Sequence, residues 1–114
     1  MSIVNEYKFY GTNFTSSVEA AILTPSIASS GAVETFIIKS FRVTNNTANT
    51  PTITITNGTT KIVNLQQLDA NSSVEILTLP LIVESGIELK VKMSSADSTD
   101  IGVSYLNISQ EVTI

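Results

Sequence analysis

The side chains that could do chemistry in this chain are serines, lysines and carboxylates, because histidine and cysteine are both absent. A nucleophilic triad needs a base that accepts the proton of the nucleophile near neutral pH, and histidine usually fills that role. A serine–lysine pair such as Lys39-Ser40 is the remaining option, but neighbours along a strand point to opposite faces. The sequence therefore contains no recognisable catalytic residue, and we expect that the protein is not an enzyme.

The closest group of carboxylates is Asp97 and Asp100, in the segment 94–100. Carboxylate and hydroxyl oxygens suit a hard cation such as calcium. The spacing is not that of an EF-hand loop, and Asp and Ser are common turn formers, so a polar turn is the favoured interpretation. Zinc would need His or Cys, and no glycine-rich phosphate loop is present. We predict no metal site, no cofactor site and no catalytic site.

Aromatic residues gather near the start of the chain as Tyr7, Phe9, Tyr10 and Phe14. No clear strand period buries them, and exposed apolar patches usually mark an interface. We expect residues 1–14 to form an N-terminal arm, with these four side chains making contacts between subunits. In the alternative, the arm folds back as an edge strand of its own domain. A platform for carbohydrate or nucleic acid bases is a weaker alternative.

Length and composition describe one small domain with a weakly charged surface. The chain has 114 residues, of which 14% are charged, against roughly 25% in an average soluble domain. The net charge is −4 and the six basic residues are scattered, which argues against direct binding of nucleic acid. No apolar run approaches the length of a membrane span. We also expect no secretory segment, so that the chain is made in the cytoplasm.

Alternating apolar and polar residues predict β-strands throughout. Residues 87–93 alternate most regularly. Residues 52–56 and 59–65 flank Asn57-Gly58, which predicts a type I′ hairpin in which both turn residues have a positive φ. Val63 and Leu65 are expected to share one face of the second strand.

The remaining strand predictions cover residues 18–23, 36–45, 74–79 and 101–108. In residues 36–45 the apolar side chains change parity, which indicates either a bulge near Lys39-Ser40 or burial on both faces at one end. Residues 18–23 fit an edge strand, with a helical turn as the alternative. Short strands at this spacing predict an all-β fold, a single antiparallel β-sandwich over residues 15–114, jelly-roll-like or immunoglobulin-like. Leu89, Val91, Val103 and Tyr105 are expected in its core.

Five segments occur in an order that resembles small β-sandwich virion structural proteins of tailed bacteriophages. They are IKSFRVTN (38–45), TITIT (52–56), LDANSSV (68–74), LPLIVESGIELKV (79–91) and VSYL (103–106). The resemblance covers roughly residues 34–108 and consists mostly of turn and core positions. Such proteins often have Gly-Asp where this chain has Ser85-Gly86-Ile87, a departure that concerns the turn.

The resemblance implies a non-enzymatic virion subunit, of the capsid decoration or cement type or a head–neck or tail accessory. Its partners would be copies of itself and other virion proteins, such as the major capsid, portal or neck proteins. It would be made in the bacterial cytoplasm and located in the virion. The alternative is a receptor- or glycan-binding module of a tail or head fibre, which would use loops at one end of the sandwich.

Overall fold

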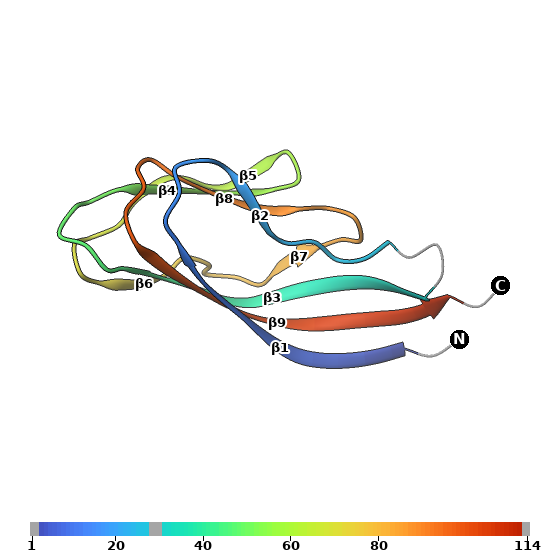
Figure 1. Ribbon diagram of the computed structural model, residues 1–114. Coiled ribbons are helices and arrows are strands. Elements are labelled where there is room, and N and C mark those ends of the chain that lie inside the picture. Colours follow the sequence, from blue (N-terminus) through green and yellow to red (C-terminus); the bar gives the residue numbers. More distant parts are fainter. Residues whose placement is uncertain (1–2, 28–30, 113–114) are drawn as a thin grey trace.

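The computed structural model describes residues 3–27 and 31–112, and these form two packed antiparallel sheets (Figure 1). The described residues include no helix, and so none long and apolar enough to cross a membrane. The strands are β1 (Ile3–Phe14), β2 (Ala20–Leu23), β3 (Gly31–Asn45), β4 (Thr52–Asn57), β5 (Thr60–Gln67), β6 (Ser73–Glu75), β7 (Leu81–Val83), β8 (Leu89–Met93) and β9 (Thr99–Val112).

The strand order identifies the sandwich as a jelly roll. One sheet has the order β1-β9-β3-β6, with β7 also paired to β3, and the other has the order β2-β8-β4-β5. The antiparallel pairs are nested, with β1 on β9, β2 on β8, β3 on β7 and β4 on β5. This is the pattern of one long hairpin wrapped into two layers. Of the two architectures expected from the sequence, the jelly roll is the one observed.

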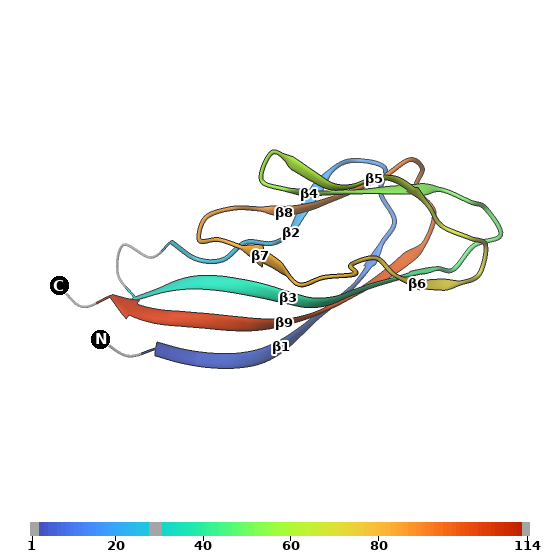
Figure 2. The same ribbon diagram turned by 180° about the vertical axis from the view of Figure 1, so that it is seen from behind.

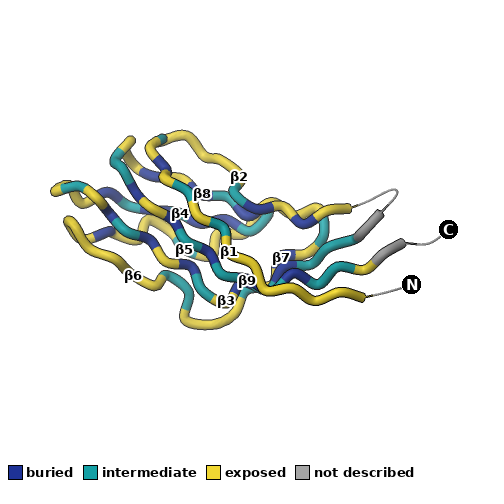
Figure 3. Tube along the Cα trace, turned by 60° about the horizontal axis from the view of Figure 1, so that its bottom comes forward, coloured by how far each residue is buried: buried dark blue, intermediate teal, exposed yellow. Residues whose placement is uncertain are grey.

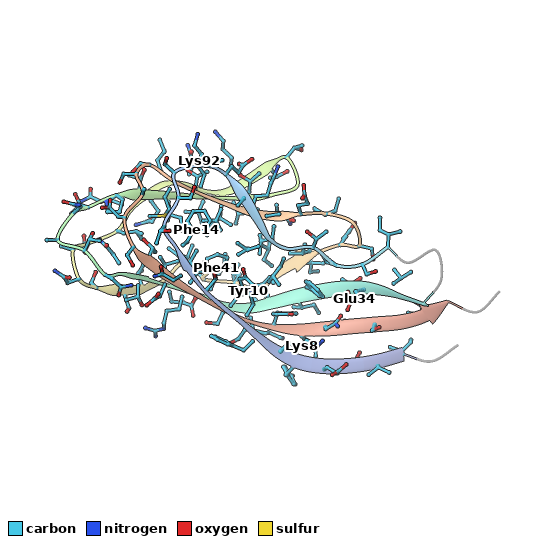
Figure 4. All side chains as sticks on the ribbon, in the orientation of Figure 1. Lys8, Tyr10, Phe14, Glu34, Phe41 and Lys92 are labelled. Atoms are coloured by element: carbon cyan, nitrogen blue, oxygen red, sulfur yellow. The ribbon has the colours of Figure 1, made fainter. Side chains whose placement is uncertain are left out.

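Apolar side chains from both layers meet between the sheets and form the core. The four expected core residues, Leu89, Val91, Val103 and Tyr105, are all buried there. β8 and β9 belong to different sheets, so these residues face one another across the sandwich. In Figure 4, Tyr10, Phe14 and Phe41 also project between the layers.

A bulge at Lys39 explains why the buried side chains of β3 change from one parity to the other. The pairing of β3 with β9 shifts register between Ile38 and Ser40, and the buried residues are Ile38 before the bulge and Phe41 after it. The carboxylate of Glu75 holds the bulge, since it accepts hydrogen bonds from the Ser40 hydroxyl and, at 2.6 Å, from the Phe41 backbone N–H. Of the two interpretations of this segment, the bulge is confirmed.

The predicted hairpin exists, but its turn lies one residue later than expected. Asn57 pairs with Thr60, so the two turn residues are Gly58 and Thr59. Gly58 has a φ of 66°, whereas Asn57 has no positive φ, which is the pattern of a type II′ turn. Asn57 is held in the strand because its side-chain amide donates to the backbone carbonyl of Ile82 at 3.1 Å. The prediction of a type I′ turn at Asn57-Gly58 was therefore wrong.

Two other strand predictions differ in detail. Leu65 adopts a φ of 54° within β5, where pairing with β4 is irregular. As a result Leu65 is exposed while Val63 is half-buried, and the two do not share a buried face. Of predicted strand 74–79 only Val74 and Glu75 are in strand β6, and the chain continues without strand pairing to β7. Residues 20–23 form the edge strand β2 rather than a helical turn.

The segment expected as an arm is strand β1, at the edge of its sheet. All its residues from Ile3 to Phe14 pair with β9 in a continuous register. This corresponds to the alternative in which the segment folds back on its own domain. The first half of β1 nevertheless projects with β9 and β3 beyond the second sheet, toward the end where β1 begins and β9 ends (Figures 1 and 2). The molecule is accordingly elongated, with extents of 53 × 22 × 21 Å.

Candidate interaction surface

Strand β1 presents two different faces. Tyr10 packs against the core and Phe14 is 8% exposed within it, so these two residues lie on the inward face. Tyr7 and Phe9 have the opposite parity and are 80% and 71% exposed. Of the four aromatic residues predicted to make contacts between subunits, the structure leaves Tyr7 and Phe9 accessible to a partner.

Tyr7 begins a line of apolar side chains across the outer face, which is the face of the β1-β9-β3 sheet turned away from the second sheet. Tyr7 pairs with Leu106 on β9, Leu106 pairs with Ile37 on β3, and Ile37 pairs with Ile82 on β7. Leu106 and Ile37 are half-buried, and Ile82 is 56% exposed. We call these four residues the apolar row.

Phe9 lies next to the apolar row and close to two glycines. A Cβ atom built on Gly11 would lie 2.8 Å from the Phe9 ring, and one built on Gly102 would lie 3.1 Å from it. Gly11 and Gly102 are directly paired across β1 and β9. The missing side chains leave room for the distal atoms of the Phe9 ring beside both strands, an aromatic–glycine arrangement that recurs in β-sheets.

A groove of about 580 Å³ continues the outer face beyond Phe9. Its polar lining includes Ser40 and Arg42 from β3 and Asp100 and Ser104 from β9. The Asn13 amide donates to the Asp100 carboxylate at 2.8 Å, and this bond is the main cause that lowers the pKa of Asp100. The groove thus joins an aromatic wall to a fixed carboxylate and a guanidinium.

Residues 94–98 form a polar loop before β9, as the favoured interpretation of residues 94–100 predicts, whereas Thr99 and Asp100 lie in β9 itself. The Asp97 carboxylate accepts hydrogen bonds from the Ser95 hydroxyl and, at 2.8 Å, from the Asn49 amide. These bonds lower the pKa of Asp97, the Ser95 contribution being the larger. Across the described residues, no group of three or more His, Cys, Asp or Glu side chains is placed to hold a metal.

The serine–lysine pair is not assembled. The hydroxyl of Ser40 donates to Glu75 and not to Lys39, which is the exposed residue of the bulge. The Glu75 carboxylate that could activate this serine is itself occupied by the Phe41 backbone N–H. Ser40 therefore has a structural role in holding the bulge.

The inward face of the projecting part is polar. The amide of Asn107, which is 2% exposed, donates to the Glu34 carboxylate at 2.8 Å. The backbone N–H of Ser26 donates to the other oxygen of Glu34 at 3.1 Å. These bonds fasten the segment after β2 to β3 and β9, so the projecting part is stiffened on the side that faces the second sheet.

Three residues of the apolar row were not predicted from the sequence: Leu106, Ile37 and Ile82. Ile37 directly precedes the buried Ile38, and Leu106 directly follows the buried Tyr105. Adjacent apolar residues in a strand place one side chain on each face. Such doublets are the signal that could have located the apolar row.

Comparisons with known proteins leave the family open. No protein-family model matches the chain, and no curated protein matches it. One solved structure similar to this chain is described as "Bacillus endospore appendages form a novel family of disulfide-linked pili". The identity is 11%, the match covers 98% of this chain and 90% of that one, and the TM-score is 0.44. None of these comparisons points to a bacteriophage protein, so that resemblance stays a prediction.

Proposed function

We propose that the protein is a non-enzymatic structural subunit that works in many copies on a larger particle. The observation behind the proposal is the apolar row, which runs across four strands of the outer face and ends in the exposed side chains of Tyr7 and Ile82. Contiguous exposed apolar surface of this kind usually marks an interface. The resemblance in the sequence suggests a tailed-phage virion as the particle, with a capsid decoration or head–neck role.

The weakly charged surface and the absence of histidine and cysteine support a structural role over catalysis. The jelly roll itself occurs in capsid proteins and in lectins alike, so the fold is compatible with the proposal without selecting it. The partners that we propose are copies of this chain and neighbouring proteins of the same particle.

The test is to localise the tagged chain on purified native particles by immunogold negative staining. A regular shell or ring of label is the expected result. The double variant Tyr7→Ser/Ile82→Ser should reduce incorporation at least several-fold, since it places hydroxyls at both ends of the apolar row. Leu79→Ser is the matched control, because Leu79 is 76% exposed outside the row. Equal incorporation of all three proteins would contradict the proposal.

A glycan-binding module is the second candidate function. It is favoured by the groove beside Phe9, where an aromatic ring, Arg42 and Asp100 line one open space. A ring face packs on a sugar, and charged groups can fix its hydroxyls. Glycan-array binding that is lost in Phe9→Ala and in Arg42→Ala would support it. Binding of no glycan, with label in a regular shell, would favour the structural role.

A further inference from the structure

The free edge of β1 differs from the other sheet edges among the described residues. β1 pairs with β9 over twelve residues without a register shift, and none of the described strands pairs with its other side. Each unpaired edge strand offers backbone N–H and C=O groups to another strand. A long and regular edge is therefore a ready template for adding a strand.

The other edges are interrupted or short, features that discourage such pairing. β2 has four residues and an irregular register, while β6 and β7 have three residues each. β5 is longer, but its register shifts twice and Leu65 has a positive φ. Thus the one edge without such an interruption, among the described strands, is β1.

The first half of β1 is also accessible from both sides. Residues 3–9 are all exposed (yellow along β1 in Figure 3), including the inward-facing Glu6 and Lys8. The second sheet does not cover this part of the strand. An added strand would therefore meet no obstruction from the second sheet.

We propose that β1 pairs with β1 of a second copy of this chain, antiparallel and centred on Tyr7, and this rests on the proposed multi-copy function. In this register Glu6 lies opposite Lys8 of the second copy, and Lys8 lies opposite its Glu6. Opposite charges directly across an antiparallel pair stabilise it, and like charges destabilise it. The pairing is self-complementary, as a two-fold interface requires.

The charges select this register among its neighbours. If the pair were centred on Glu6, the two Glu6 side chains would lie opposite each other. If it were centred on Lys8, the two Lys8 side chains would lie opposite each other. In a parallel, in-register pair, Glu6 would lie opposite Glu6 and Lys8 opposite Lys8. Within the described part of a single copy, the structure contains one ion pair, Lys90–Glu19. Glu6 and Lys8 are thus available to the second copy.

The same register joins the outer faces of two copies. Tyr7 would meet Tyr7 of the second copy, so the two apolar rows form one continuous line through the shared sheet. Phe9 would lie opposite Asn5, Val4 opposite Tyr10, and Ile3 opposite Gly11. The result is a single sheet with the order β3-β9-β1-β1-β9-β3 at its centre, presenting a doubled apolar surface to the particle.

A charge-swap experiment on the full chain tests the pairing, with sedimentation equilibrium as the measurement. Glu6→Lys and Lys8→Glu should each weaken dimerisation by about tenfold or more, because each opposes like charges twice. The double variant Glu6→Lys/Lys8→Glu should restore the wild-type dissociation constant to within about threefold. Glu84→Lys and Lys92→Glu, which are exposed outside β1, are the controls and should dimerise as the wild type. Thermal unfolding checks that every variant is folded.

A cysteine cross-link tests the register, since the chain has no native cysteine. Directly opposite residues of an antiparallel pair lie within disulfide range. Tyr7→Cys should form a disulfide-linked dimer under mild oxidation, whereas Phe9→Cys alone should not. Cross-linking of Phe9→Cys instead would overturn the register.

The outcomes separate this proposal from the proposed function. A wild-type chain that remains monomeric at about 1 mM, or single charge variants that dimerise as the wild type does, would overturn β1 pairing. If such a chain still labels particles in a regular array, the multi-copy function stands without this interface. If it also fails to label particles, both proposals fail.

Discussion

At the scale of single residues, Leu89 shows what the core contributes. Its side chain is fully buried between the sheets, and removing a buried leucine side chain leaves a cavity as well as losing burial. Leu89→Ala should lower the free energy of unfolding by about 2–5 kcal/mol in chemical denaturation. Leu79→Ala makes the same chemical change at a side chain that is 76% exposed. Equal losses in the two variants would show that β8 does not face the core as described.

The carboxylates around the β8–β9 loop predict a particular dependence on pH. Hydrogen bonds lower the pKa of both Asp97 and Asp100 below their unfolded value of 3.8. A carboxyl whose pKa is lower in the folded state stabilises the fold above its unfolded pKa, and that contribution is lost as pH falls through the folded pKa. The thermal midpoint should therefore decline as pH falls from about 4 toward about 2.

The double variant Asp97→Asn/Asp100→Asn isolates this contribution in differential scanning calorimetry. It should be less stable than the wild type at pH 6 and should show a shallower decline below pH 4. Glu84→Gln removes one exposed carboxyl elsewhere and is the charge control. Parallel profiles for the wild type and the double variant would mean that these hydrogen bonds do not contribute to acid stability.

At the scale of elements, the bulge in β3 determines which side chains of that strand enter the core. Glu75→Ala removes the acceptor for the Ser40 hydroxyl and the Phe41 backbone N–H. Loss of hydrogen bonds to a charged group on the surface should lower the free energy of unfolding by about 1–2 kcal/mol. The Phe41 amide should also exchange with solvent faster in hydrogen-exchange measurements.

Glu88→Ala provides the comparison for Glu75→Ala, because Glu88 is likewise exposed but lies outside the bulge. Its free energy of unfolding should stay within about 0.5 kcal/mol of the wild type. If the two variants lose equal stability, or if exchange at Phe41 is unchanged, Glu75 does not hold the bulge.

The strands that could be predicted from the sequence are those with one buried and one wet face. In β8 the buried Leu89, Val91 and Met93 alternate with Lys90 and Lys92, so periodicity alone locates them. In β3 the bulge reverses the parity after Ile38. Sequence could indicate an irregularity near Lys39, but choosing the bulge needs the carboxylate of Glu75, which comes from another strand.

Strand β1 shows why the candidate surface could be predicted only in part. Along residues 3–9 neither face is buried, so the sequence has no sustained alternation of apolar and polar residues there that would predict a strand. The exposed aromatic residues Tyr7 and Phe9 were recognisable, but Leu106, Ile37 and Ile82 join them only through pairings between distant strands. A sequence shows the members of such a surface, and the register of the sheet brings them together.

At the scale of the whole molecule, the projecting half of β1 and its core half should respond differently to truncation. Residues 3–8 are exposed, whereas Tyr10 and Phe14 pack on the core. Deletion of residues 1–8 should leave a folded domain, with a thermal midpoint within several degrees of the wild type, that no longer dimerises. Deletion of residues 1–14 should unfold the domain or lower its midpoint far more.

The two truncations are compared by far-UV circular dichroism on heating and by sedimentation. An unfolded 1–8 deletion would mean that the projecting half is needed for the fold. A 1–14 deletion with wild-type stability would contradict the packing of Tyr10 and Phe14.

The nested pairing of the strands has a consequence for how the chain acquires its structure during synthesis. β9 lies between β1 and β3, yet it leaves the ribosome after every other described strand. Ile3 pairs with Gln110, and at about 5–20 residues per second the chain between them takes about 5–20 seconds to synthesise. Until then β1 and β3 lack their common neighbour. The sheet that contains β1 and β3 can therefore form only after β9 has been synthesised, and contacts this distant in sequence place the domain among slowly folding ones.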